Sequence, residues 1–152
     1  MASSITTTLV NIVSSLQTLG IFDRVNSVEP KAPPGNGLTA AVFFTSAQPA
    51  AAASGLGTAS GVYVFTCRVY SNMLQEPADQ IDSQLIRATD AVCDALAGDF
   101  DMGATVRNLD IFGAHGTPLL ARAGHVDVGG QMYRAIDITI PLIVNDAWAE
   151  AP

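Results

Sequence analysis

Histidine and serine are the residues of this sequence that could carry acid–base or nucleophilic chemistry. Only two histidines are present, His115 and His125. Catalysis by a serine needs a nucleophile turn of the GxSxG type with a positioned histidine and acid, and the sequence contains no such turn. We expect His115 in a glycine-flanked turn and His125 on a strand, facing solvent or a sheet edge. The sequence therefore predicts no catalytic residues and a protein that is not an enzyme.

Two acidic residues and one glycine-rich segment could suggest ligand sites. Asp99 and Asp101 lack the further ligands and terminal glutamate of a calcium loop, so we expect turn acids that bind the local backbone. Gly35-Asn36-Gly37 precedes a strand pattern and lacks the lysine of a phosphate loop, so its glycines are expected to permit a sharp entry into that strand. The sequence predicts no metal site and no cofactor.

Composition excludes one class of partner and leaves two readings of the apolar content. The net charge is −7, with 7 Lys and Arg against 14 Asp and Glu, so there is no basic stripe for tight binding of nucleic acid. DNA is expected at most as cargo passing a like-charged surface. Hydrophobic residues make up 49% and charged residues 14%, which predicts either apolar surface buried between subunits or a large core padded by alanine.

The cysteines and the first residues indicate whether the protein is exported or placed in a membrane. Cys67 and Cys93 lack the CxxC spacing of zinc and redox sites, so we expect reduced core residues, with a disulfide between them as the lesser alternative. The start has no basic n-region, and no apolar run approaches the roughly 18 residues that span a bilayer. We expect a soluble protein without a signal peptide or a membrane partner.

Two amphipathic helices are predicted. Apolar residues at helical spacing predict the first over residues 5–19, with Ser3 or Ser4 as its N-cap and Gly20 as its left-handed end. The second follows residues 76–79 and ends at Gly98, with Leu85 and Val92 on its apolar face.

Strand patterns fill most of the remaining chain. They predict strands near residues 22–28, 38–45, 62–72, 105–112, 119–128 and 132–144, and Gly129-Gly130 predicts a tight hairpin between the last two. In the final strand Ile136, Ile138 and Ile140 share one face, the period of a half-buried strand. We expect one α+β domain over residues 1–152, a mostly antiparallel sheet with both helices on one face. A flexible hairpin arm is predicted around residues 46–61, and a short tail over residues 145–152.

Without catalytic chemistry, function is expected on surfaces that bind other proteins. Long loops and an unplaced aromatic residue mark most of the candidates. Arg107 and Arg134 lie on predicted strands, and each is expected to pair either with an acid of the sheet or with a partner subunit. The candidates for contact between subunits are Pro33, Pro34, Gly35, Asn36, Gly37, Ser54, Leu56, Arg107, Arg134 and Trp148.

Several segments, taken in order, resemble one family. These are Val28-Glu29-Pro30-Lys31, Gly35-Asn36-Gly37-Leu38-Thr39-Ala40-Ala41, Met73-Leu74-Gln75-Glu76-Pro77, Thr105-Val106-Arg107-Asn108, Met132-Tyr133-Arg134, Ile138-Thr139-Ile140-Pro141 and Val144-Asn145-Asp146. Together they are similar to the tail terminator proteins of long-tailed, siphovirus-type actinobacterial phages. None is a mechanistic motif, so the specificity of the likeness lies in their number and order.

The resemblance implies a role in virion assembly. It implies a small protomer, made in the host cytoplasm, that closes into a hexameric ring on the head-proximal end of the tail. Its implied partners are further copies of itself, the tail tube protein and the head–tail connector, with genome DNA passing through the ring. Two other classes stay open from the residues: a neck or tail tube subunit, and an enzyme or small-molecule binder with a pocket beside His115 or the Asp99/Asp101 turn.

Overall fold

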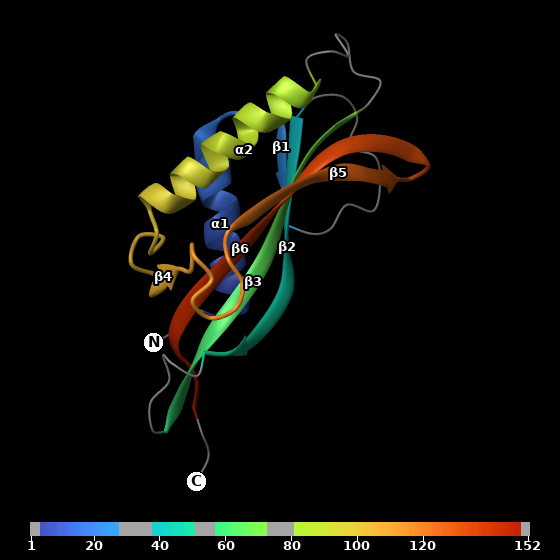
Figure 1. Ribbon diagram of the computed structural model, residues 1–152. Helices are drawn as coiled ribbons and strands as arrows, with labels where there is room; N and C mark the ends of the chain where they lie inside the picture. The colour runs from blue at the N-terminus through green and yellow to red at the C-terminus, as the bar shows by residue number, and fades with distance from the viewer. Residues whose placement is uncertain (1–3, 28–37, 51–56, 73–80, 150–152) are drawn as a thin grey trace.

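A computed structural model describes residues 4–27, 38–50, 57–72 and 81–149 of the chain. Two helices cover one face of a strongly twisted sheet (Figure 1). The elements are α1 (Ile5–Leu19), β1 (Arg24–Asn26), β2 (Leu38–Pro49), β3 (Thr58–Asn72), α2 (Ile81–Gly98), β4 (Asn108–Leu109), β5 (Leu120–Val128) and β6 (Gln131–Ala149). The sheet order is β1-β2-β3-β6-β4, and β5 also pairs with β6. All these pairs are antiparallel except β1 with β2. The predicted α+β architecture is confirmed.

Local signals set the limits of α1. The Ser4 hydroxyl accepts a hydrogen bond from the Thr7 N–H at 3.1 Å, which satisfies one of the free donors of the first turn. At the other end, Gly20 adopts φ 69° and its N–H donates to the Gln17 carbonyl at 3.2 Å. A side chain at that left-handed position would be strained, so glycine ends the helix as predicted.

The main core lies between the helices and one face of the sheet. Side chains from α1, such as Ile12, and from α2, such as Val92, meet alternate residues of β3 and β6. The face predicted for the last strand is confirmed, because the following are all buried in this core: Ile136, Ile138, Ile140, Leu142 and Val144. Both glycines of the predicted hairpin turn, Gly129 and Gly130, have positive φ, at 61° and 82°.

The opposite face of the sheet carries none of the described helices, yet parts of it are buried. Tyr70 and Tyr133 pack edge to face, with ring centroids 5.6 Å apart, in a small cluster with Ala41 and Ala135. Burial raises the pKa of both tyrosine hydroxyls. We name this surface the helix-free face.

A charged pair crosses the helix-free face. Arg68 donates to both carboxylate oxygens of Asp137 on the neighbouring strand, through Nε at 2.9 Å and Nη2 at 3.2 Å. The guanidinium also lies over the Phe43 ring, 5.4 Å from its centroid. The pair therefore links β3 to β6 on this face.

The prediction of a strand over residues 105–112 is wrong. Only Asn108 and Leu109 pair with β6, and the flanking residues form turns. Met102, Gly103 and Ala104 all have positive φ, which bends the chain before the ladder can begin. Beyond it, the buried Asp110 carboxylate accepts the N–H groups of Ala114 and His115, each at 2.9 Å, and the chain turns away.

Strands also extend further than predicted around the arm and the tail. β2 continues to Pro49 and β3 begins at Thr58, so residues 46–49 and 58–61 belong to paired strands, while residues 51–56 lie outside the described part. The predicted tail is wrong over residues 145–149, since β6 runs through Ala149. The first predicted strand reduces to β1, which pairs parallel to Thr39–Ala41, a partner that local patterning does not reveal.

Both cysteines are free, as predicted. Cys67 is fully buried in the core and Cys93 is half-buried on α2. None of the helices in the described ranges combines the length and apolar character needed to cross a membrane.

Candidate assembly interface

The sheet ends in two edges that no described strand covers completely. β5 pairs only with β6, so its outer side is open along Leu120–Val128. On the other side of the sheet, β1 covers only Thr39–Ala41, which leaves β2 open beyond Val42. An open edge presents unpaired N–H and C=O groups and is a template for pairing with another chain.

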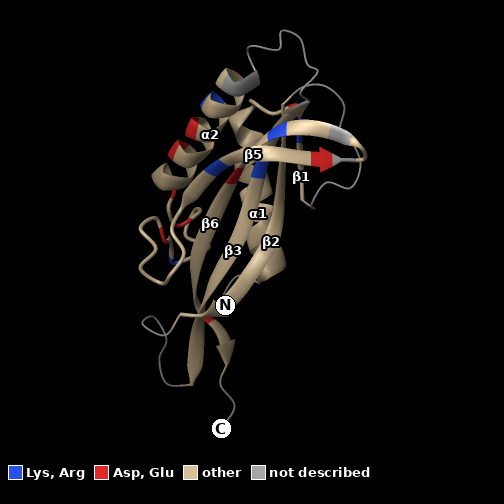
Figure 2. Cartoon of the chain, turned by 45° about the vertical axis from the view of Figure 1, so that its right-hand side comes forward, with Lys and Arg blue, Asp and Glu red and all other residues tan. Residues whose placement is uncertain are grey.

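The open part of β2 belongs to a long extension of the sheet that carries almost no charge. No Asp, Glu, Lys or Arg occurs between Lys31 and Arg68. Figure 2 shows the lower ends of β2, β3 and β6 projecting beyond the helices. In the described residues of this extension, Asp146 is the only charged residue. We name this part the uncharged arm: residues 43–50, 57–65 and 142–149. Charged residues usually protect exposed edges, and here that protection is missing.

Trp148 lies on the uncharged arm and packs on its own sheet. Its ring stacks at a tilt on Tyr63, with centroids 5.9 Å apart, and remains 37% exposed. The aromatic residue that the sequence left unplaced therefore docks on Tyr63 of β3. The absence of a side chain at Gly61 makes room for the indole, because a Cβ there would lie 3.0 Å from the Trp148 ring.

A bulge in β6 turns the chain just before Trp148. The register with β3 shifts between Ala59 and Gly61, and Asp146 adopts φ 51°. Thr58 Oγ1 donates to Asp146 Oδ1 at 2.7 Å, and the Asp146 N–H donates to Ser60 Oγ at 3.2 Å. These bonds hold the bulge that precedes Trp148.

The single tryptophan makes this contact measurable. Replacing Gly61 by alanine is expected to displace the indole, to shift its fluorescence to longer wavelength and to destabilise the fold by about 1–3 kcal/mol through overpacking. Gly98→Ala is the control, because nothing lies within 4 Å of a Cβ at that position. Emission unchanged in Gly61→Ala would contradict the packing described for Trp148.

The two predicted arginines lie apart from each other. Arg107 is exposed at the base of the arm, where its Nη1 donates to Asn145 Oδ1 at 3.3 Å beside an open cavity of about 480 Å³. Arg134 is half-buried in the β5–β6 hairpin and donates to the Gly124 carbonyl at 3.1 Å. Arg107 and Trp148 thus lie near one bulge, while Arg134 belongs to the other edge. The remaining candidates lie outside the described residues: Pro33, Pro34, Gly35, Asn36, Gly37, Ser54 and Leu56.

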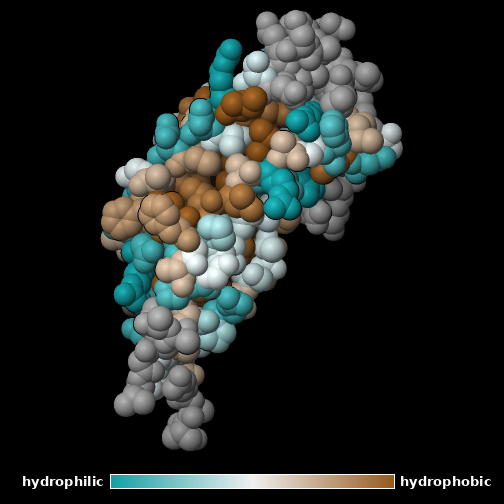
Figure 3. All heavy atoms as spheres, viewed as in Figure 1, coloured by the Kyte–Doolittle hydropathy of each residue, from teal (hydrophilic) through white to brown (hydrophobic). Residues whose placement is uncertain are grey.

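Hydrophobic side chains gather on a second surface, where α2 ends and β5 begins (Figure 3). Three exposed large residues belong to this part of the chain: Phe100, Phe112 and Leu120. Phe112 is 94% exposed, an unusual position for a phenylalanine side chain. Together with the open edges, this adds to the apolar surface that a partner could cover.

The positions that suggested an enzyme or a metal site have local structural roles. Asp99 Oδ1 accepts the Gly103 N–H at 3.0 Å, as expected for a turn acid. His115 is half-buried in the turn that Asp110 holds, and His125 is exposed on the edge strand β5, as predicted. Within the described ranges, no three His, Cys, Asp or Glu side chains come together as metal ligands.

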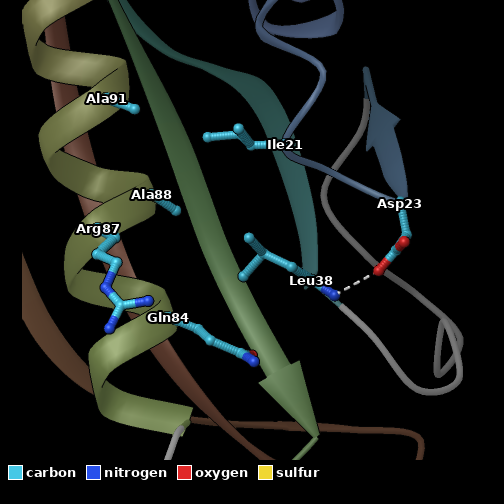
Figure 4. A pocket seen from close by; sticks show the side chains of 7 residues that line it. All are labelled: Ile21, Asp23, Leu38, Gln84, Arg87, Ala88 and Ala91. Carbon is cyan, nitrogen blue, oxygen red and sulfur yellow. Dashed lines mark hydrogen bonds between the residues drawn. The ribbon is translucent and has the colours of Figure 1, made fainter.

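A small pocket of about 350 Å³ lies between α2 and the start of β2 (Figure 4). Leu38 and Ile21 form its apolar wall, and Arg87 and Gln84 come from α2. The Asp23 carboxylate beside it already accepts the Leu38 N–H at 2.8 Å. Among the described residues that line the pocket, Asp23 is the only acid, and neither His115 nor Asp99 contributes to the lining.

Solved structures that are similar to this chain include components of a gene transfer agent particle and of a contractile injection system. No protein-family model matches the chain, and no curated protein matches it. A chain from the virion of a native gene transfer agent particle aligns with a TM-score of 0.45 and 20% identity, covering 90% of this chain and 92% of that one. The sheath/tube terminator of an extracellular contractile injection system, in its extended state, aligns with a TM-score of 0.37 and 12% identity over 100% of this chain and 61% of that one.

Proposed function

We propose that this protein is a structural component of a phage virion, a tail terminator that caps the head-proximal end of the tail tube. In this role six copies form a closed ring. One side of the ring meets the last tube ring and ends tube polymerisation, and the other side offers a surface to the head–tail connector. The segments from Val28 to Asp146 that resemble tail terminators suggest the role.

The uncharged arm is the observation that carries the proposal. It extends beyond the helices with an open strand edge and a half-exposed tryptophan, a surface suited to another protein and unsuited to free solvent. The turns that could have formed a catalytic or metal site are instead held by local hydrogen bonds.

A terminator needs no covalent step. One face of the ring must complement the tube, and the other must be unable to recruit a further tube subunit. Ring closure distinguishes such a protein from a tube subunit, which stacks openly. The net charge of −7 per copy suits a conduit for DNA, because like charge keeps the passing genome from adhering.

The test is the mass of the purified protein by size-exclusion chromatography with light scattering, alone and with preassembled tail tubes of the same particle. We expect a discrete hexamer, or monomers that assemble only on one end of the tube. Open polymers would instead indicate a tube subunit. A monomer that does not bind the tubes would contradict the proposal and favour ligand binding instead. A ligand-induced rise in melting temperature would then be the measurement.

A further inference from the structure

We propose that neighbouring copies of this chain join by strand addition, with the open edge of β2 over residues 43–49 pairing with the open edge of β5 in the next copy. The inference rests on the proposed ring and supplies the contact between its neighbours. The fold leaves one open edge at each side of the same sheet, so β2 of one copy can lie beside β5 of the next.

The β5 strand is exposed to an unusual degree. Of residues 120–127, only Gly124 and Val126 are half-buried, and β6 is the only described strand that pairs with β5. The hairpin of β5 and the start of β6 projects away from the helices in Figure 1. A nine-residue strand held from one side only offers its whole outer ladder to a partner.

The β2 edge has the matching properties. Its open part spans seven residues and includes Phe44, which is 44% exposed, and the exposed Ser46 and Gln48. It bears no charge, while β5 carries Arg122, His125 and Asp127. Pairing the two edges therefore brings no like charges into opposition.

Strand direction agrees with this pairing. The order β2-β3-β6-β5 is antiparallel at each step, so β2 and β5 of one copy run in opposite directions. In copies related by rotation, β2 of one copy would thus meet β5 of the next antiparallel. Each copy uses each edge once, so the contact joins two different surfaces. Such a heterologous contact generates a ring when the rotation between copies closes.

With the middles of the two open edges paired, their offset along the strands agrees with that of a closed sheet. Gly124 in β5 lies opposite Ala135, which lies opposite Tyr70, which lies opposite Thr39 of β2. Ser46, near the middle of the open part of β2, is seven positions beyond Thr39, one of which is taken up by a bulge. Six residue steps correspond to an offset of about 20 Å along the strands. Four strands span a width of about 19 Å, so the strands would tilt by about 45° from the axis of the closed sheet. Strands of closed barrels tilt by about 35–45°.

Disulfide trapping tests the contact directly. In a Cys93→Ala background, Ser46→Cys is combined in turn with Arg122→Cys, Ala123→Cys, Gly124→Cys and His125→Cys, and the protein is oxidised alone and on tail tubes. Because each copy then carries both partners, we expect at least one combination to give a ladder beyond the dimer. In the control, Gln17→Cys takes the place of Ser46→Cys. Gln17 lies on α1 and is exposed like Ser46, so this control should give no ladder. Dimers formed by Ser46→Cys alone would show β2 paired with β2 and overturn the inference.

Lysines on the edge give an independent test. Ser46→Lys with Gln48→Lys should weaken association at least tenfold. With Ser46 opposite Gly124, the lysine at position 48 would face Arg122 of the next copy, and lysines on an edge strand oppose strand pairing. The matched control, Ser14→Lys with Gln17→Lys on the exposed side of α1, makes the same residue changes and should stay within twofold of the parent protein. Melting temperatures of both pairs report any loss of folding.

The outcomes separate the two proposals. A ring that forms without any ladder and is indifferent to the edge lysines would overturn strand addition alone and leave the terminator role standing. A protein that remains monomeric both in solution and with tubes would overturn the terminator role and, with it, the contact proposed here.

Discussion

Replacing Phe65 by alanine is expected to destabilise the protein by about 3–5 kcal/mol, because the ring is fully buried and its loss opens a cavity in the core. Phe65 lies on β3 between the helices and its neighbouring strands, and it packs edge to face on Phe44 with ring centroids 5.9 Å apart. The measurement is the free energy of unfolding by urea titration, below the concentration at which copies associate.

Phe112→Ala is the matched control for this substitution. Its side chain is 94% exposed, so the same chemical change should alter the stability of the isolated chain by no more than about 0.5 kcal/mol. If the two variants lost similar stability, Phe65 would not occupy the core position described here.

Alkaline pH is expected to destabilise the fold through Cys67. Burial, assisted by the charges of Asp137 and Cys93, raises the pKa of this thiol from 9.0 to about 12. Below pH 9 the thiol is neutral in both states and contributes nothing. Between pH 9 and pH 12 the unfolded chain loses the proton while the native state keeps it, so stability falls by about 1.4 kcal/mol per pH unit, roughly 4 kcal/mol in all.

The pH dependence of unfolding in Cys67→Ala checks this prediction. The variant starts less stable because a buried side chain is shortened, but its stability should fall less steeply between pH 9 and pH 10. Above pH 10 the buried hydroxyls of Tyr63, Tyr70 and Tyr133, whose pKa values burial also raises, add to the slope in both proteins. Equal slopes below pH 10 would show that the Cys67 thiol ionises as easily in the native state as in the unfolded chain.

The features that could be predicted from the sequence are those fixed by neighbours along the chain. The limits of α1 follow from the Ser4 hydroxyl and from Gly20, and the last hairpin follows from Gly129 and Gly130. The apolar alternation of β6 was visible because one face packs on the helices along most of the strand. In each case the deciding interaction lies within a few residues, where composition and spacing are informative.

The misread segments depend on contacts that spacing does not encode. The run after Thr105 has strand-like residues, but the left-handed residues at 102–104 and the carboxylate of Asp110 convert most of it to turns. The parallel pairing of β1 with β2 and the position of β5 at an edge are long-range facts of strand order. The open edges of β2 and β5 could therefore not be predicted. The absence of charged residues between Lys31 and Arg68 does mark β2 as an unprotected edge.

The uncharged arm has a consequence for the medium in which assembly takes place. Each copy carries a net charge of −7, while the edge proposed to join copies bears no charge on its β2 side. Copies therefore repel one another at long range through groups that play no part in the contact, and the contact itself has little attraction for salt to weaken. At an ionic strength of about 0.15 M, where the screening length is about 8 Å, the repulsion is damped and the strand contact is not. Added salt should thus promote association, the reverse of its effect on subunits held together by ion pairs.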